Sequence, residues 1–449
     1  MSRLPRLLLR LVLVLIALLA IAAAAGWWAV RGSLARLDGD LALPGLSAPV
    51  SIERDRLGVV TVHAANEMDA ARALGYVHGQ ERFFEMDLLR RSAAGELSEL
   101  FGKIALEKDK SIRVHRLRYR VTRALSMIAG NKLPTLVAYS EGVNAGRKQL
   151  RTRPWPYLLL RAQPRDWQPA DSVLVGYAMF FDLQDESNSR ELALWKIRQV
   201  IPDALYRIIN SDGTQWDAPV RGVARGNVAL PGADVLDLRK LPAPLEKNPT
   251  DVSEQAAPGS NNFAVAGSHT RDGRAIVAGD MHLTLRAPNI WFRARLMYGD
   301  ASAPGGTVDI NGFTLPGIPT VIVGSNRHVA WSFTNSYGDW LDFYQVRWTD
   351  KSHSRYRTAA GEQAIAVVDE PILVKGEPTQ AFTVRETIWG PITSEQDGNT
   401  SLALRWAAHQ PGAINLGLSD LATAGGLDTA LARAGSVGMP AQNLVIADA

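Results

Sequence analysis

The sequence predicts a protein of the α+β class, with a mainly helical first part and a strand-rich second part. The pattern between residues 116 and 208 is mostly helical and is interrupted at prolines. From Ser260 onward, short apolar runs predict strands instead. Residues 215–258, which separate the two parts, are rich in Pro, Gly, Asp and Asn and predict a linker. Helices and strands segregated along the chain are typical of α+β folds.

The first thirty residues differ from the rest of the chain. Arginines at positions 3, 6 and 10 precede an apolar run from Leu11 to Val30, which ends with Trp27 and Trp28. Twenty apolar residues can cross a bilayer, whereas the small residues 22–26 would suit signal cleavage. Residues 1–30 are therefore predicted to be a signal peptide or a membrane anchor. In either case we expect the rest of the protein to be periplasmic or otherwise extracytoplasmic, either secreted or anchored by residues 11–30.

Local signals predict the elements that follow. Alternating residues between Ala48 and Val62 indicate a strand, a turn and a second strand. Asn66 is suited to cap the next helix, and a further helix should end before Gly95. Beyond Ser260, strands are expected around residues 263–265, 275–278, 321–323 and 329–333, with a hairpin turn at 324–327.

Composition excludes several kinds of site. The 49 basic and 45 acidic side chains give a net charge of +4 without a basic run beyond the first ten residues, so nucleic-acid binding is not indicated. The absence of cysteine excludes disulfides, thiolate metal sites and a cysteine nucleophile. No His-Glu-x-x-His, Gly-x-Ser-x-Gly, Gly-x-Gly-x-x-Gly or phosphate-loop motif is present. Eight scattered histidines show no pair at the helical spacing of a metal site.

A linker that runs directly into Ser260 suits an N-terminal nucleophile. Gly259 permits a strained scissile peptide, so that the Ser260 hydroxyl could attack the preceding carbonyl. The α-amine released by this cleavage would have a reference pKa of about 7.7–8.0 and could serve as the base for its own hydroxyl. The alternative is an ordinary Gly-Ser-Asn turn, which local sequence alone does not distinguish from a nucleophile.

A series of motifs is spread over residues 48–449. They comprise Ile52-Glu53-Arg54-Asp55 with Gly58-Val59, Gly75-Tyr76-Val77-His78-Gly79-Gln80-Glu81-Arg82-Phe83-Phe84-Glu85-Met86-Asp87, Arg90-Arg91-Ser92-Ala93-Ala94-Gly95-Glu96-Leu97, Pro258-Gly259-Ser260-Asn261-Asn262-Phe263, Gly279-Asp280-Met281-His282-Leu283, Leu315-Pro316-Gly317, Trp331-Ser332-Phe333-Thr334-Asn335 and Pro440-Ala441-Gln442-Asn443. Together these motifs resemble the penicillin amidase family of N-terminal-nucleophile hydrolases, and the resemblance favours the nucleophile over the ordinary turn.

The resemblance implies a four-layer αββα sandwich with antiparallel sheets, and it assigns roles to particular residues. Ser260 would be the nucleophile and, through its own amine, the base. The backbone N–H of Asn335 and the side-chain amide of Asn443 would stabilise the oxyanion. His282 and Leu283 would border the substrate, and Leu283 suggests an apolar acyl group.

The resemblance also implies a structural Ca²⁺ ion and no organic cofactor. Asp339, the carbonyl of Leu341 and Asp342 occupy matching positions, and such oxygen ligands suit Ca²⁺. The ligand from the first chain is ambiguous, because the matching stretch carries Asn188 or Ser189, with Glu186 close by.

The resulting organisation is a first chain at 31–230, a spacer at 231–259 and a second chain at 260–449 that is incomplete at its C-terminus. The expected function is a self-processing acylase that hydrolyses a linear amide in a penicillin, an acyl-homoserine lactone or another N-acyl compound. Its partners would be that small molecule and its own cleaved chains as a heterodimer, and an antibiotic-degrading role would follow for penicillins. The alternative is an inactive or truncated membrane-anchored scaffold that binds an acylated ligand. A γ-glutamyl-transferase-like enzyme fits the surrounding motifs less well.

Overall fold

The computed structural model describes residues 3–185, 187–219, 221–240, 259–283, 285–396 and 400–448. Most of the predicted spacer, residues 241–258, lies outside this range. Of its described residues, which are 231–240 and Gly259, Leu238–Lys240 form a short 3₁₀ turn. Gly259 and Ser260, which flank the predicted scissile bond, are both described.

Helices dominate the first part, as predicted. They are α1 (Arg3–Gly32), α2 (Glu67–Glu81), α3 (Phe83–Ala94), α4 (Ser98–Phe101), α5 (Leu106–Arg113), α6 (Leu117–Ala129), α7 (Leu133–Lys148), α8 (Trp155–Leu159), α9 (Pro169–Leu183), α10 (Ser189–Arg198) and α11 (Asp203–Ile209). The second part contains α12 (Leu427–Ala434). Asn66 caps α2, accepting a 3.0 Å hydrogen bond from the Asp69 N–H. Gly95 ends α3 in the left-handed conformation, with φ 65°. Both predicted boundaries are confirmed.

A seven-stranded sheet joins the two parts of the chain, in the order β1-β2-β5-β6-β7-β8-β16. Its strands are β1 (Ser51–Arg54), β2 (Val60–His63), β5 (Phe292–Gly299), β6 (Thr307–Thr314), β7 (Val321–Ser325), β8 (Val329–Asn335) and β16 (Gln442–Asp448). The β1–β2 and β7–β8 hairpins were predicted. The sheets are antiparallel as predicted, with one exception among the described strands, because β2 and β5 run parallel. A long connection through the helical region allows the chain to return to the same end of the sheet.

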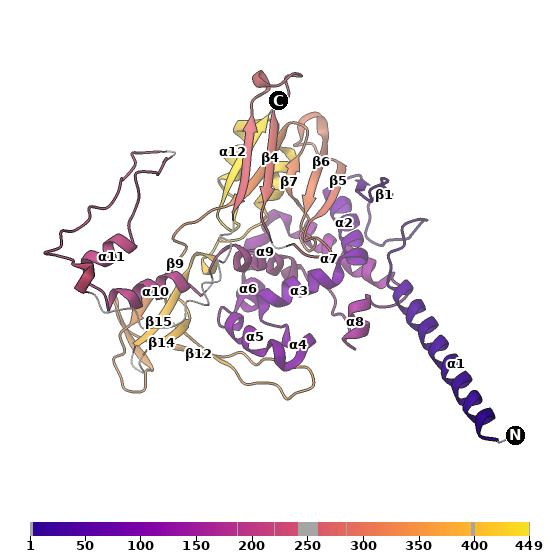
Figure 1. Ribbon diagram of the computed structural model, residues 1–449. Helices are drawn as coiled ribbons and strands as arrows, with labels where there is room; N and C mark the ends of the chain where they lie inside the picture. The colour runs from indigo at the N-terminus through magenta and orange to yellow at the C-terminus, as the bar shows by residue number, and fades with distance from the viewer. Residues whose placement is uncertain are drawn as a thin grey trace.

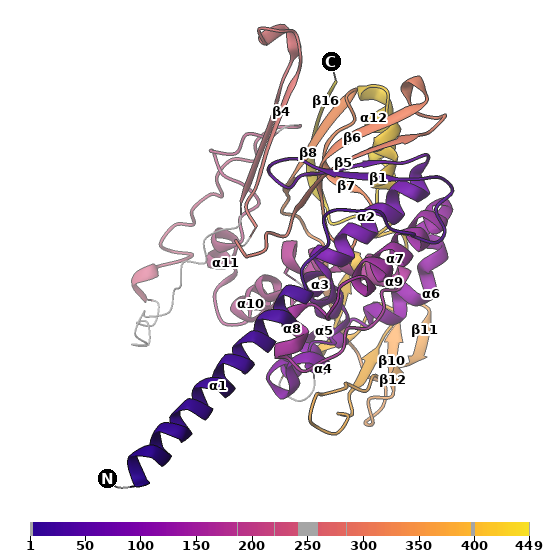
Figure 2. The same cartoon turned by 90° about the vertical axis from the view of Figure 1, so that its right-hand side faces the viewer.

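The sheet lies between a helical layer and a two-stranded sheet. Helix α2 packs on β2 and β5, with α7 and α9 behind it (Figures 1 and 2). On the other face, β3 (Ser260–Val265) and β4 (Ile276–Met281) form an antiparallel hairpin that contacts β8 and β16. The α+β prediction is confirmed. In the described residues the helical layer, the seven-stranded sheet and the β3–β4 sheet are stacked in that order, and they correspond to three of the four predicted layers.

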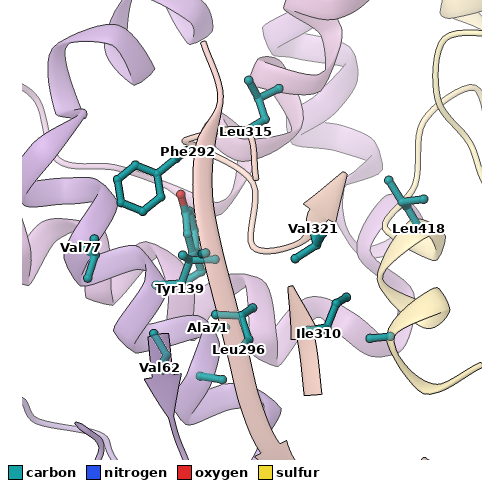
Figure 3. Packing of buried hydrophobic residues seen from close by; sticks show 14 of the residues in the cluster. Val62, Ala71, Val77, Tyr139, Phe292, Leu296, Ile310, Leu315, Val321 and Leu418 are labelled. Atoms are coloured by element: carbon teal, nitrogen blue, oxygen red, sulfur yellow. The ribbon is translucent and has the colours of Figure 1, made fainter. Parts of the chain in front are cut away.

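The main core fills the space between helices and sheet. Alternate residues of β5 point into it, which is why its exposure pattern alternates along the strand. Figure 3 shows Val62, Ala71, Val77, Tyr139, Phe292 and Leu296 meeting there from β2, α2, α7 and β5.

Helices α2 and α7 approach so closely that their backbones touch. Two glycines on each helix, spaced by four residues, face the partner: Gly75 and Gly79 on α2, and Gly142 and Gly146 on α7. A Cβ atom at any of the four would lie 2.0–2.2 Å from a backbone oxygen of the other helix. Glycine is therefore a packing requirement at these positions, not a source of flexibility.

A second group of strands extends from the other end of the helical layer. It contains the sheet β14-β15-β9 and the hairpins β10–β11 and β12–β13. Their bounds are β9 (Leu341–Val346), β10 (Arg355–Thr358), β11 (Gly361–Ala364), β12 (Ala366–Asp369), β13 (Thr383–Glu386), β14 (Ile392–Gln396) and β15 (Thr400–Trp406). The sheet places β9 beside α10, where the predicted calcium ligands lie.

Candidate active site

Ser260 is the first residue of β3 and lies at one end of the β3–β4 hairpin. It pairs with Met281 of β4, and its Oγ accepts a hydrogen bond from the backbone N–H of His282 at 3.3 Å. Gly259, which precedes it, is exposed. The strand register thus fixes the backbone of Ser260 while the peptide on its N-terminal side remains accessible.

Ser260 borders a mainly apolar cavity. One face of α9 supplies Val173, Met179 and Leu183, and the β-rich part supplies Leu283 and Phe333. The other lining residues are Ile128, Ser172, Gly176, Met281, Trp291, Leu315, Ile318, Thr320, Ile322, Asn335, Ile414, Asn415, Leu416, Leu418, Gly438, Met439, Pro440 and Gln442. A hydroxyl at the edge of an apolar cavity can meet a polar bond whose apolar substituent enters that cavity.

The predicted oxyanion residues are neighbours on adjacent strands. Asn335 ends β8 and lines the cavity, and its side chain donates to the Leu183 carbonyl at 3.1 Å. Asn443 lies next to it on β16, and its Nδ2 donates to Thr334 Oγ1 at 3.1 Å and to the Asn335 carbonyl at 3.2 Å. The side-chain amide of Asn443 is therefore engaged within the protein, and it would have to turn to reach a ligand.

Of the two predicted substrate-binding residues, Leu283 and His282, only Leu283 is among the residues that line the cavity. The His282 ring is about half exposed and its Nε2 lies 2.7 Å from Asp280 Oδ2, so the imidazole is held by a carboxylate on its own hairpin. The contact between His282 and Ser260 is made by the backbone of His282.

A buried network supports the cavity wall from the helical side. His78 of α2 lies 2.8 Å from Tyr139 Oη through Nδ1 and 3.1 Å from Thr314 Oγ1 through Nε2. Tyr139 Oη also accepts the N–H of Gly317 at 2.8 Å. Burial, with a smaller contribution from Arg82, lowers the pKa of His78 to about 3, so the imidazole is neutral at pH 7. This network holds the backbone beside Leu315 and Ile318, two of the lining residues.

Three charged residues of the first-chain signature, Asp87, Arg90 and Arg91, form a buried ion-pair cluster with Asp171. Asp87 binds both Arg90 and Arg91, at 2.7 and 2.9 Å, and Arg90 also binds Asp171. Burial by itself would raise the pKa of Asp87, but the two guanidinium groups outweigh burial and lower it. This part of the signature is structural, since removing one partner would leave a buried charge uncompensated.

The predicted calcium residues lie near the carboxylate of Glu191, which the sequence analysis did not identify. Burial, followed by repulsion from Asp339 and Asp342, raises the pKa of Glu191 on α10. Such repulsion is what a bound cation would relieve, and Glu191 supplies a carboxylate from the first chain. However, within the described residues no three His, Cys, Asp or Glu side chains are gathered closely enough to hold a metal ion. The residue types fit Ca²⁺, but their arrangement does not form a closed site.

Of the positions considered for the first-chain ligand, Glu186 lies outside the described residues. Asn188 is buried, and its Nδ2 has no hydrogen-bond partner in the described part of the chain. Leu341 begins β9 between the two aspartates and is itself buried.

Comparison with known families identifies the chain. The family described as Penicillin amidase matches residues 49–449. The chain belongs to the penicillin amidase family. This match includes every element of the sheet and both sides of the Gly259–Ser260 peptide.

Named relatives of this penicillin amidase family member are acylases. Penicillin acylase 2 proenzyme from Pseudomonas sp. (strain SE83) is 31% identical over 370 residues, which cover 81% of this chain and 46% of the relative. Acyl-homoserine lactone acylase QuiP from Pseudomonas fluorescens (strain Pf0-1) is 28% identical over 438 residues, which cover 94% of this chain and 52% of the relative. The chain spans about half the length of these curated relatives. A solved thermostable penicillin G acylase from Alcaligenes faecalis is 24% identical, covering 39% of this chain and 98% of that one, with a TM-score of 0.33.

Proposed function

We propose that this penicillin amidase family member hydrolyses the linear amide bond of an N-acyl compound through Ser260. The observation that carries the proposal is the position of Ser260 at the start of β3, on the rim of the apolar cavity. An apolar acyl group in the cavity would leave its carbonyl carbon beside the Ser260 hydroxyl. Curated relatives named for penicillin and acyl-homoserine lactones suggest the substrate classes to test first.

The proposed reaction begins with maturation of the chain itself. Ser260 Oγ attacks the Gly259 carbonyl, the peptide bond is exchanged for an ester, and water hydrolyses the ester. This cleavage would leave two associated chains and a free α-amine on Ser260. The amine has a reference pKa of about 7.7–8.0, so near neutral pH a substantial fraction is unprotonated and able to accept the hydroxyl proton.

Turnover of substrate repeats the same chemistry on an external amide. The hydroxyl proton passes to the α-amine as Oγ bonds to the carbonyl carbon, and the tetrahedral oxyanion accepts hydrogen bonds from the Asn335 backbone and the Asn443 side chain. The leaving amine takes a proton as the C–N bond breaks. Water then attacks the acyl-enzyme ester and releases the carboxylic acid. In this proposal His282 positions Ser260 through its backbone N–H.

Calcium and location belong to the same proposal. Glu191, Asp339 and Asp342, with the Leu341 carbonyl, would hold Ca²⁺ in a structural role only after moving closer together, because in the described residues they do not form a closed site. Residues Leu7–Gly32 of α1 are long and apolar enough to cross a membrane, although a signal sequence would have the same properties. We infer an extracytoplasmic location for the domain that follows.

The test is release of the amine from N-acyl substrates by the purified protein. Penicillins and N-acyl-homoserine lactones of increasing acyl length should be screened with the wild type, Ser260→Ala and the control Ser268→Ala. Ser268 is an exposed serine in the turn of the same hairpin. Hydrolysis by the wild type and the control, but not by Ser260→Ala, would support the proposal. Equal turnover by all three proteins would refute the role of Ser260.

A further inference from the structure

The segment 151–161 carries an exposed apolar and basic face that the proposed reaction does not use. Trp155 and Leu159, at the two ends of α8, are 50% and 75% exposed, whereas Tyr157 between them is fully buried. Because Tyr157 fixes α8 against the core, the outward direction of the other two side chains is set by the fold. Two exposed apolar side chains are by themselves ordinary for a folded protein, so what they indicate depends on the groups beside them.

This segment is attached directly to the end of α1. The backbone N–H of Thr152 donates to the Gly32 carbonyl at 3.1 Å, and its hydroxyl donates to the Ala29 carbonyl at 2.7 Å. Both acceptors lie in the last turn of α1, immediately after Trp27 and Trp28. Figures 1 and 2 both show α8 beside this end of α1, at the point where the helix leaves the domain.

The charge of the segment is also distinctive. Arg151, Arg153 and Arg161 form no ion pair within the described residues, and the buried Arg153 Nε has no hydrogen-bond partner there. By contrast, the nearby cations Arg147 and Lys148 both bind Asp166. Arginines without carboxylate partners, next to an exposed Trp and Leu, are suited to lipid phosphates and the bilayer interface.

We propose that segment 151–161 lies in the headgroup region of the anionic bilayer that α1 crosses, and so forms a second membrane contact. Trp155 and Leu159 enter the interface, while the three arginines bind lipid phosphates. Two contacts on one side fix the orientation of the domain, which a single helix would leave free to rotate. The far tip of the β3–β4 hairpin then points away from the membrane (Figure 1). This inference does not depend on the proposed catalytic function, but it rests on α1 being retained as a membrane anchor.

The absence of native cysteine allows a direct test with single nitroxide labels. The full chain would be synthesised into nanodiscs of phosphatidylcholine and phosphatidylglycerol, with label at Leu159→Cys or at the control Ile276→Cys. Ile276 is 51% exposed and lies on β4, away from α1. The Leu159 label should collide several-fold less often with a water-soluble nickel chelate, and more often with oxygen, than the control label. Equal nickel accessibility at the two sites would overturn the proposal.

A second experiment tests the lipid chemistry. The change Arg151→Gln combined with Arg161→Gln should raise nickel accessibility at the Leu159 label in nanodiscs that contain phosphatidylglycerol. In the protein that keeps Arg151 and Arg161, replacing phosphatidylglycerol by phosphatidylcholine should also raise nickel accessibility at the Leu159 label. If neither change alters accessibility, the assignment of these arginines to anionic lipid is wrong.

Discussion

The close contact between α2 and α7 predicts a large penalty for one added methyl group. At Gly142 a Cβ would lie 2.0 Å from the Arg72 carbonyl oxygen, whereas ordinary contact begins at 3.4 Å. The helices would therefore have to separate by about 1.4 Å, because both obstructing groups are backbone and no side-chain rotation relieves the clash. We expect Gly142→Ala to lower the free energy of unfolding by about 3 kcal/mol, the upper part of the usual range for overpacking.

The assay is urea unfolding at 25 °C followed by tryptophan fluorescence and far-UV circular dichroism. The matched control is Gly435→Ala at the end of α12, where φ is −62° and the nearest atom to an added Cβ is 3.5 Å away. This control should be neutral or slightly stabilising, because Ala restricts the unfolded chain more than Gly does. If Gly142→Ala unfolds within roughly 0.5 kcal/mol of the wild type, a surface-like effect, the backbone contact is not as tight as described.

Three further predictions concern the site and its supports. Asn443→Ala should lower kcat by about 10²–10³-fold, because it removes an oxyanion donor. Asn335→Ala should lower kcat much less, since its backbone N–H remains. Equal losses of kcat in steady-state assays would contradict these roles. Burial lowers the pKa of His78 to about 3, so below pH 6.5 the unfolded chain binds a proton that the folded chain excludes. Its contribution to the free energy of unfolding should therefore fall by about 1.4 kcal/mol per pH unit between pH 6.5 and 3, and His78→Gln should remove that slope in denaturant titrations; an unchanged slope would show that His78 is not buried as a neutral group. Ca²⁺ should raise the melting temperature of the wild type more than that of Glu191→Gln in calorimetry, and an identical response would place the ion elsewhere.

Local features of the fold were predictable from the sequence because their causes are local. The Asn66 cap, the Gly95 helix end and the β1–β2 hairpin each depend on a few neighbouring residues. The parallel pairing of β2 with β5 depends instead on the path that the chain takes through the helical layer between these two strands. The glycine contact between α2 and α7 was missed for a related reason, although the paired four-residue spacings at 75/79 and 142/146 were a visible signal.

The candidate site shows the same division. Ser260, Leu283 and Asn335 come together at one cavity, and the resemblance had named all three. Glu191 was missed, because the register of α10 against β9 is set by tertiary packing and cannot be read from sequence spacing. The present hydrogen bonds of Asn443 to β8 were equally inaccessible, since they depend on the side-chain conformation at a strand pair formed by distant segments.

If Ser260 becomes an N-terminal nucleophile, maturation should make Ser260 the first residue of a new chain. The chain should be expressed as the wild type and as Ser260→Ala, and both products analysed by intact mass and N-terminal sequencing. The wild type should yield a new chain that begins Ser-Asn-Asn, whereas the variant should remain uncut. A folded wild-type protein that remains uncut, or the same cut in Ser260→Ala, would contradict this role of Ser260.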